Sequence, residues 1–212
     1  MTRPTLVIAT PSPFARKARI ALIEKGVDFA VEVDNPWNPG ARAPAVNPLG
    51  KIPVLVTPEH GAIFDSGVIV EYAEARWPAP ALLPVDALGR VFVRQVEAVA
   101  DGICDAVVLI VLERARPAAM QSGDWLRRQL AKVEGGVDEM ERRLDARAWF
   151  VGDAFGLADI AAGCALGYLD LRLPEFAWRA RAPRLTAWFA ALSCRDSFRQ
   201  TVPSAQPIDA VR

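Results

Sequence analysis

The first third of the chain alternates short apolar runs with longer amphipathic ones. The short runs, each flanked by turn residues, have the length and composition of β-strands and cover residues 6–9, 29–33, 52–56 and 62–64. Apolar residues recur at helical spacing between and after them, over 14–26 and 66–77. The turn sequence TPEHG separates the last two strand-like runs and predicts a hairpin. Interleaved strands and helices predict an α/β layer.

The rest of the chain has a different pattern of predicted secondary structure, because strand-like runs largely disappear after residue 85. Residues 87–116 have the pattern of one long helix, and a second helical pattern covers 123–144. The proline-rich stretch WPAPALLPVD between the two halves reads as a linker. We therefore predict a thioredoxin-like α/β domain over residues 1–78, a linker over 79–87 and an all-α helical domain over 88–212.

Composition narrows the choice of function classes. Hydrophobic residues make up 52% of the 212 residues, which is enough for a substantial core. Lys plus Arg and Asp plus Glu are equal at 25 each, so the basic excess typical of a nucleic-acid binder is missing. The first apolar stretch is too short for a signal-peptide core, and no run of 18 apolar residues predicts a membrane span. We expect a cytoplasmic protein with no nucleic-acid or membrane partner.

The few cysteines and the single histidine argue against a metal cofactor. Cys104, Cys164 and Cys194 lie far apart and form no CxxC pair, so neither a disulfide framework nor a thiolate metal site is expected. His60, in the turn PEHGA, is expected to be a solvated turn residue, and no second histidine is available to share a metal with it.

The stretch TPSPFARKARIAL, residues 10–22, raises the main functional question. Ser12 is a good N-cap, Pro13 suits the first helical position, and Gly26 fits just past the helix end. The pattern lets the cationic side chains of this helix reach solvent, namely Arg16, Lys17 and Arg19. Ser12 has a second possible role in the same geometry. A hydroxyl at a helix N-terminus, beside unpaired amides, can donate to a thiolate and favour it over the thiol.

Two further stretches carry candidate chemistry. In NPLGKIPVLV, Pro53 opens a strand where an amide donor would normally be needed, which is compatible with a cis Ile52–Pro53 bond or with an ordinary trans proline. In IFDSGVIVEYA, Asp65 or Ser66 caps a helix, and the amides and hydroxyl at such a helix start can bind a carboxylate.

Together, and in this order, the three stretches resemble the glutathione transferase family. SPFARKARIAL is similar to the segment that runs from the family's catalytic residue into a helix, NPLGKIPVL to its cis-proline segment, and DS before GVIVEYA to its γ-glutamyl-binding helix start. The all-α second half also fits the family, so the resemblance covers nearly the whole chain. The SPF-x-R-K form is most similar to bacterial members related to the zeta, omega and beta classes.

The resemblance implies a role for each matching residue. Ser12 corresponds to the residue that contacts the glutathione sulfur, and the hydroxyl of Thr10 is the nearest alternative. In DAFGLADIAAG, Asp159 corresponds to the structural residue of a helix-capping box, in which Gly156 replaces the usual Ser or Thr. The glutathione-binding positions implied are Phe14, Lys51, Ile52, Pro53, Asp65 and Ser66.

The same resemblance implies an activity. Glutathione would be the co-substrate, its thiolate would be activated at a serine-type site toward a small hydrophobic electrophile, no metal would be required, and the protein would be a homodimer. Two alternatives stay open: a non-catalytic glutathione-binding or ligand-binding protein of the same fold, and a glutathione-dependent thiol–disulfide reductase. Serine at position 12, where omega-like and beta-like members carry cysteine, argues against the reductase.

Overall fold

The computed structural model describes residues 3–206 and divides them into two compact units. One unit comprises residues 3–82 together with residues 196–206, and the other comprises residues 83–195. The sequence-based division instead placed residues 88–212 in the helical domain. The difference arises because the end of the chain packs against the first unit.

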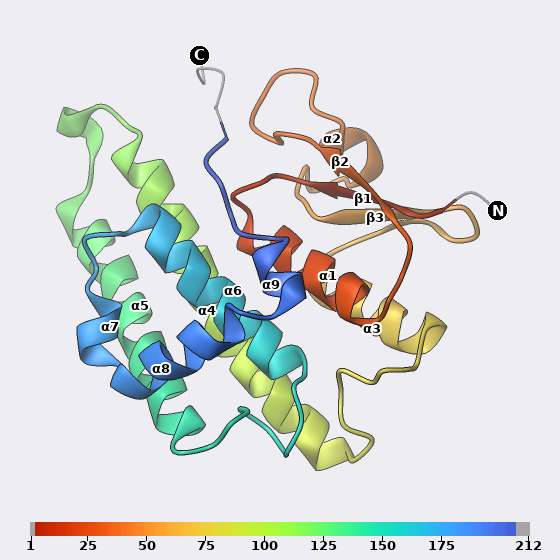
Figure 1. Ribbon diagram of the computed structural model, residues 1–212. Coiled ribbons are helices and arrows are strands. Elements are labelled where there is room, and N and C mark those ends of the chain that lie inside the picture. Colours follow the sequence, from red (N-terminus) through yellow and green to blue (C-terminus); the bar gives the residue numbers. More distant parts are fainter. Residues whose placement is uncertain (1–2, 207–212) are drawn as a thin grey trace. The chain divides into compact units, whose positions relative to one another are not determined.

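The first unit is a four-stranded sheet with helices, as predicted (Figure 1). Its strands run in the order β2-β1-β3-β4; β1 and β2 are parallel, whereas β1–β3 and β3–β4 are antiparallel. The antiparallel pair β3–β4 is the predicted hairpin. The elements in chain order are β1 (Thr5–Ile8), α1 (Pro13–Glu24), β2 (Ala30–Val33), α2 (Ala43–Val46), β3 (Val54–Thr57), β4 (Gly61–Ile63), α3 (Ser66–Arg76) and, from the chain end, α9 (Asp196–Arg199).

The core of this unit follows from the two periodicities. Leu6 and Ile8 are two residues apart on β1 and therefore face the same side of the sheet. They are buried with Leu55 of β3 and with the apolar faces of α1 and α3, whose buried residues here are Ala15, Ala18, Leu22, Ile69 and Ala73. Helix α1 ends as predicted, because Gly26 follows it with a φ of +64°, a conformation that glycine adopts without steric cost.

The cationic side chains of α1 are the clearest error of the sequence analysis. Arg16 and Lys17, predicted to reach solvent, are buried. The reason for Arg16 is the end of the chain, which packs on this face of α1. Its guanidinium donates to Thr201 Oγ1 and to the Phe198 carbonyl, both at 3.3 Å, and lies 5.1 Å from the centroid of the Phe198 ring.

The second unit is entirely helical in its regular structure. Its elements are α4 (Ala87–Arg114), the short 3₁₀ helix η1 (Ala118–Met120), α5 (Gly123–Leu144), α6 (Leu157–Arg172), α7 (Trp178–Arg181) and α8 (Pro183–Leu192). The predicted long helix is α4, and the second predicted helix is α5. Helix α4 packs against both α5 and α6, and every residue from Leu157 to Leu169 of α6 is buried. Helix α6 is therefore the centre of the helical core.

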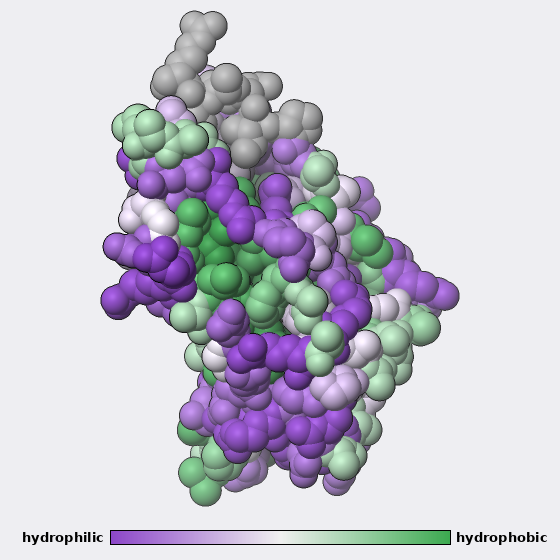
Figure 2. All heavy atoms as spheres, turned by 90° about the vertical axis from the view of Figure 1, so that its left-hand side faces the viewer, coloured by the Kyte–Doolittle hydropathy of each residue, from purple (hydrophilic) through white to green (hydrophobic). Residues whose placement is uncertain are grey.

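The buried and exposed faces of α5 agree with this packing. Helix α5 buries Val133, Val137 and Met140 on one face and exposes charged side chains on the other. Figure 2 turns the left-hand side of Figure 1 toward the viewer, where α5, α7 and α8 lie, and hydrophilic side chains cover most of that face, around a smaller group of hydrophobic ones. No helix among residues 3–206 is both long enough and apolar enough to cross a bilayer.

Candidate functional site

The three stretches singled out in the sequence meet at one edge of the sheet. Strands β1 and β3 are antiparallel with Val7 opposite Val54, so the end of β1, which leads to Ser12, lies beside the start of β3, which follows Pro53. Strand β4 is antiparallel to β3 with Ile63 opposite Leu55, so its end leads into Asp65 at the same edge. The sheet register thus brings together three segments that are separate in the sequence (Figure 1).

Ser12 is the N-cap of α1, as its sequence predicts. Its backbone is extended, with φ −70° and ψ 121°, and its Oγ accepts a hydrogen bond of 3.2 Å from the Ala15 amide. The tight turn before it is closed by a bond of 3.0 Å from the Ser12 amide to the Ala9 carbonyl. Because the cap uses only an acceptor lone pair of the hydroxyl, the proton of Ser12 remains available. No hydrogen bond from that hydroxyl to any of residues 3–206 is present.

Thr10 is in the opposite situation. Its hydroxyl donates to the Ser204 carbonyl at 3.0 Å, so its single proton is already used. Its amide donates to Gln206 Oε1 at 3.1 Å. Ser12 and Thr10 are both half-buried, but of the two only Ser12 has an uncommitted hydroxyl proton. Neither Ser204 nor Gln206 was singled out in the sequence, because nothing local marks a contact with a residue nearly 200 positions away.

The loop before β3 is held by a residue that the sequence analysis missed. Asn47 is buried, its side-chain amide donates to the Lys51 carbonyl at 2.8 Å, and its Oδ1 accepts from the Leu49 amide at 2.9 Å. An Asn followed by Pro is a typical turn-initiating pair, and that signal was present. The Ile52–Pro53 peptide bond is cis, one of the two forms left open by the sequence. The side chain of Lys51 is exposed and that of Ile52 is partly buried against the sheet core.

The start of α3 combines a cap with an unused hydroxyl. Asp65 is the N-cap, and its Oδ1 accepts from the amides of Gly67 at 3.0 Å and Val68 at 3.4 Å. Ser66 is buried, and its hydroxyl has no partner among the described residues. This hydroxyl can therefore form a hydrogen bond with a ligand or with water. The amides of the first helical turn favour an anionic ligand there.

Asp159 lies in the helical unit, near the start of α6. It is 1% exposed, and its two carboxylate oxygens accept from the Phe150 amide at 3.0 Å and from the Gly156 amide at 2.9 Å. Burial raises the pKa of this carboxyl group to about 6, although the hydrogen bonds from the backbone act in the opposite direction. Since Gly156 has no side chain, Asp159 supplies the only side-chain bond of this helix cap.

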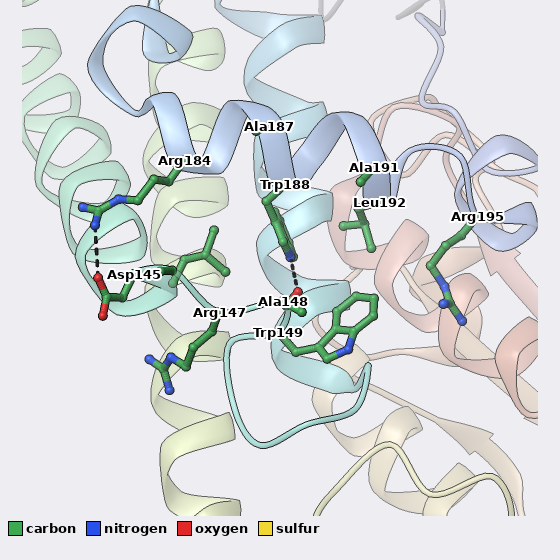
Figure 3. A pocket seen from close by; sticks show the side chains of 12 residues that line it. Asp145, Arg147, Ala148, Trp149, Arg184, Ala187, Trp188, Ala191, Leu192 and Arg195 are labelled. Carbon is green, nitrogen blue, oxygen red and sulfur yellow. Dashed lines mark hydrogen bonds and ion pairs between the residues drawn. The ribbon is translucent and has the colours of Figure 1, made fainter.

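The helical unit also has an open pocket of about 460 Å³ beside α8 and the loop that follows α5 (Figure 3). Its polar groups are already used by the protein. Trp188 donates through its indole nitrogen to the Ala148 carbonyl, Arg184 pairs with Glu141 and Asp145, and Arg147 donates to the Arg143 carbonyl. None of the residues predicted to bind glutathione lines it. Its geometry therefore selects no particular ligand.

The remaining polar residues offer no metal site. Within residues 3–206, no group of three or more His, Cys, Asp and Glu side chains is arranged to hold an ion. His60 is exposed in the turn between β3 and β4, with its Nδ1 3.2 Å from the hydroxyl of Tyr72.

Comparison with known proteins matches both units to one family. Residues 11–76 match the glutathione S-transferase N-terminal domain, and residues 123–191 match the glutathione S-transferase C-terminal domain. Among curated proteins, the chain is 44% identical to the uncharacterised GST-like protein YibF of Escherichia coli, over 93% of this chain and 98% of that one. It is 31% identical to the maleylacetoacetate isomerase of Pseudomonas aeruginosa, over 90% and 92% of the two chains.

Solved structures of glutathione S-transferases are also similar to this chain. A glutathione S-transferase of Methylobacterium radiotolerans in complex with glutathione sulfonate superimposes with a TM-score of 0.96 at 48% identity, covering 99% of each chain. A glutathione S-transferase of Methylobacillus flagellatus with bound glutathione gives a TM-score of 0.91 at 42% identity, over 95% of this chain and 100% of the other. With both domains matched and the sheet-edge geometry in place, the chain belongs to the glutathione S-transferase family.

Proposed function

We propose that this protein binds glutathione along the first unit and activates its thiol for attack on a small hydrophobic electrophile. Ser12 is the catalytic residue and donates its hydroxyl proton to the glutathione sulfur. The backbone of Ile52, beside Lys51 and Pro53, pairs with the extended peptide, and Asp65 and Ser66 hold its γ-glutamyl end. Phe14 lies two residues after Ser12, where the family places an aromatic residue beside the sulfur. The similar structures that contain bound glutathione or glutathione sulfonate support this assignment.

One observation carries the proposal: the hydroxyl protons of Ser12 and Thr10 are used differently. Ser12 accepts a bond from the Ala15 amide and keeps its own proton free, whereas Thr10 gives its proton to the Ser204 carbonyl. A thiolate is stabilised by a hydrogen-bond donor. Ser12 is therefore the better candidate, and the cap at the same time orients its hydroxyl.

A single hydrogen bond from Ser12 is strong enough to lower the pKa of the glutathione thiol substantially. A hydrogen bond to a charged acceptor is worth ~1.5–3 kcal/mol, which lowers a thiol pKa by roughly one to two units. Starting from a typical thiol pKa of ~8.5, a shift of two units increases the thiolate fraction at pH 7 from a few per cent to roughly three quarters. The positive end of the α1 dipole acts in the same direction.

Ser12→Ala tests this function. The change removes both the donor and the cap, so the pKa of the bound glutathione thiol should rise and turnover with a generic electrophile should fall at neutral pH. Glutathione affinity should change less, because the peptide is held elsewhere. The measurement is the ultraviolet absorbance of the thiolate, titrated with glutathione bound. Ser12→Gly should give the same titration with a smaller loss of stability, because glycine is tolerated at an N-cap.

Ser122→Ala is the matched control for capping. Ser122 caps α5 through the same bond, from the Trp125 amide at 3.2 Å, but lies in the helical unit. Its loss should cost a similar ~0.5–2 kcal/mol of stability and leave the thiol titration unchanged. Thr10→Ala should also leave it near that of the wild type. A shift in Thr10→Ala together with none in Ser12→Ala would assign the thiolate to Thr10 instead.

The two rival functions give different results in the same experiments. A binding protein without catalysis would bind glutathione with an unshifted thiol and show no turnover with electrophiles. A thiol–disulfide reductase would reduce a glutathione mixed disulfide, and serine at position 12 offers no thiol for that step.

We further propose a cytoplasmic homodimer. None of Cys104, Cys164 and Cys194 is in a disulfide, which is usual in a reducing compartment. Apolar side chains are exposed along the first turns of α4, namely Leu88, Val91 and Phe92. Their spacing of three and four residues places them on one face of the helix, as expected for a surface that a partner covers.

A further inference from the structure

The segment that follows α9 returns to the turn that carries Ser12. Three hydrogen bonds join it to Thr10: the Thr10 amide donates to Gln206 Oε1 at 3.1 Å, the Thr10 hydroxyl donates to the Ser204 carbonyl at 3.0 Å, and the Ser204 amide donates to the Thr10 carbonyl at 3.4 Å. Every hydrogen-bonding group of Thr10 is thus bound to the end of the chain. Figure 1 shows this segment, in blue, running beside the start of α1, in red.

Gln206 extends the pairing of β1 with β2 by side-chain bonds. Its Oε1 accepts from the Thr10 amide just after β1, and its Nε2 donates to the Asp34 carbonyl just after β2 at 3.2 Å. The strands are parallel with Ile8 opposite Val33, and the Asp34 amide donates to the Ile8 carbonyl at 2.7 Å. The amide side chain uses its oxygen as an acceptor and one N–H as a donor here, as a peptide group does. Gln206 therefore bridges the two strand ends where their own ladder stops.

The bridge sits two residues before the proposed thiolate donor. Thr10 is the second residue of the turn that is closed by the bond from the Ser12 amide to the Ala9 carbonyl. Ser12 has to place its hydroxyl within hydrogen-bonding distance of the sulfur, and a misplacement of about 1 Å in such a contact costs up to ~100-fold in rate. We propose that Gln206 is a positioning residue that fixes this turn and so sets the hydrogen bond from Ser12 to the glutathione thiolate. This inference rests on the proposed function.

The attachment of α9 itself does not depend on Gln206. Helix α9 and the residues beside it are held to α1 by Arg16, which donates to Thr201 and Phe198, and by Ser197, which donates to Glu24 at 2.5 Å. Removing the Gln206 amide should therefore loosen the turn without detaching the chain end. A variant of Gln206 can therefore test a positioning role without removing the chain end from the fold.

The test compares Gln206→Met with Gln200→Ala. Methionine keeps the length of the glutamine side chain but offers neither a comparable donor nor a comparable acceptor. Gln200 lies in the same segment and is exposed, and its side chain has no hydrogen bond to the described residues, so it is the matched control. In Gln206→Met we expect faster hydrogen exchange of the Thr10 and Ser12 amides in the ligand-free protein. With glutathione bound, we expect a raised thiol pKa and turnover reduced by about tenfold or more, while glutathione affinity changes less than twofold.

A double variant shows whether the effect passes through Ser12. If Gln206 acts by positioning that hydroxyl, Ser12→Ala/Gln206→Met should be no slower than Ser12→Ala alone, since the group being positioned is gone. Independent, multiplying losses would contradict the inference.

Failure of this inference can be told apart from failure of the proposed function. A lowered thiol pKa in the wild type that Gln206→Met leaves unchanged overturns the positioning role and retains Ser12 as donor. An unshifted thiol in the wild type overturns the proposed function, and the positioning role with it. Unchanged amide exchange in Gln206→Met overturns the bridge itself, whatever the thiol does.

Discussion

Lys25, at the C-terminal end of α1, has a fully buried ammonium group. The exposure of its side chain is 0%, and its three protons are matched by three acceptors: Glu74 Oε1 at 2.7 Å, the Trp77 carbonyl at 2.7 Å and the Pro80 carbonyl at 2.9 Å. Glu74 also accepts from the Leu82 amide at 2.9 Å. A single side chain therefore joins the end of α1 to the end of α3 and the residues that follow it.

Replacing this lysine tests the junction. Lys25→Met should lower the free energy of unfolding by about 3–5 kcal/mol, because it leaves a largely buried carboxylate and two carbonyls without their partner. The double variant Lys25→Met/Glu74→Gln should recover part of that loss, since the uncompensated charge is removed and the Leu82 amide keeps an acceptor. Urea unfolding measures both variants. A loss below about 1 kcal/mol in the single variant would mean that the ammonium is not buried in solution.

At the scale of elements, the packing of α4 on α5 depends on a glycine. Gly135 and Gly136 are adjacent in α5 and face different surroundings. A methyl group added at Gly135 would meet nothing within 4 Å, whereas one added at Gly136 would lie 2.5 Å from Ile103 Cγ1 and 2.8 Å from Ile103 Cδ1 of α4. Close approach of the two helices requires glycine at only one of these positions.

The two alanine variants should therefore change stability in opposite directions. Gly135→Ala should raise the melting temperature, because alanine is favoured over glycine in a helix by about 1 kcal/mol. Gly136→Ala should lower it, because overpacking of a buried contact costs about 1–3 kcal/mol and outweighs the helix preference. Thermal unfolding of the pair provides its own control. Equal shifts of the same sign would contradict the packing of α4 on α5.

The start of α6 gives a prediction with a defined pH window. The pKa of Asp159 is raised from 3.8 to about 6, chiefly by burial, so between these values the folded protein holds a proton that the unfolded chain has released. Its contribution to stability should therefore increase as the pH falls through about 6, by up to about 3 kcal/mol in total.

Carboxylates with a lowered pKa lose their contribution to stability as the pH falls, so a reference variant is needed to isolate Asp159. The pKa of Glu139, for example, is lowered to about 2 by hydrogen bonds from Arg142 and then Arg143. Asp159→Asn should be less stable than the wild type at pH 7, since it accepts through one oxygen only. The difference between the two proteins in denaturant unfolding should widen from pH 7 to pH 5. A constant or narrowing difference would show that the carboxyl group titrates normally.

At the scale of the whole molecule, we propose that the protein assembles as a dimer. The exposed stripe on α4, with Leu88 69% and Phe92 52% exposed, is the clearest uncovered apolar surface on a long helix. Val68 of α3 is also exposed and offers apolar surface on the first unit. The proposed dimer joins the first unit of one chain to the helical unit of the other.

Phe92→Glu should convert such a dimer into a monomer at micromolar concentration, because it places a charge in an apolar interface. Leu112→Glu, an equivalent exposed position on the same helix about 30 Å away, should keep the dimer mass. Light scattering measures both variants. A monomeric wild type would refute the proposal outright.

Local patterns in the sequence were enough to determine most elements and the family-like site segments. Ser12, Asp65 and Gly26 lie where capping preferences place them, and the strand and helix periodicities predicted both units. These features depend on neighbours within a few residues, which is why the sequence alone reveals them. The cis form at Ile52–Pro53 was one of two local possibilities, and the tertiary structure decided between them.

Only the tertiary structure decided what the end of the chain does. Residues after α8 read as part of a helical domain, yet they bury Arg16, take the proton of Thr10 and bridge the ends of β1 and β2 through Gln206. The partners in these contacts are more than 170 positions apart, and hydrophobic periodicity carries no information about such pairs. The choice between Ser12 and Thr10 as thiolate donor depends on that packing, because a hydroxyl has one proton and the fold determines which acceptor receives it.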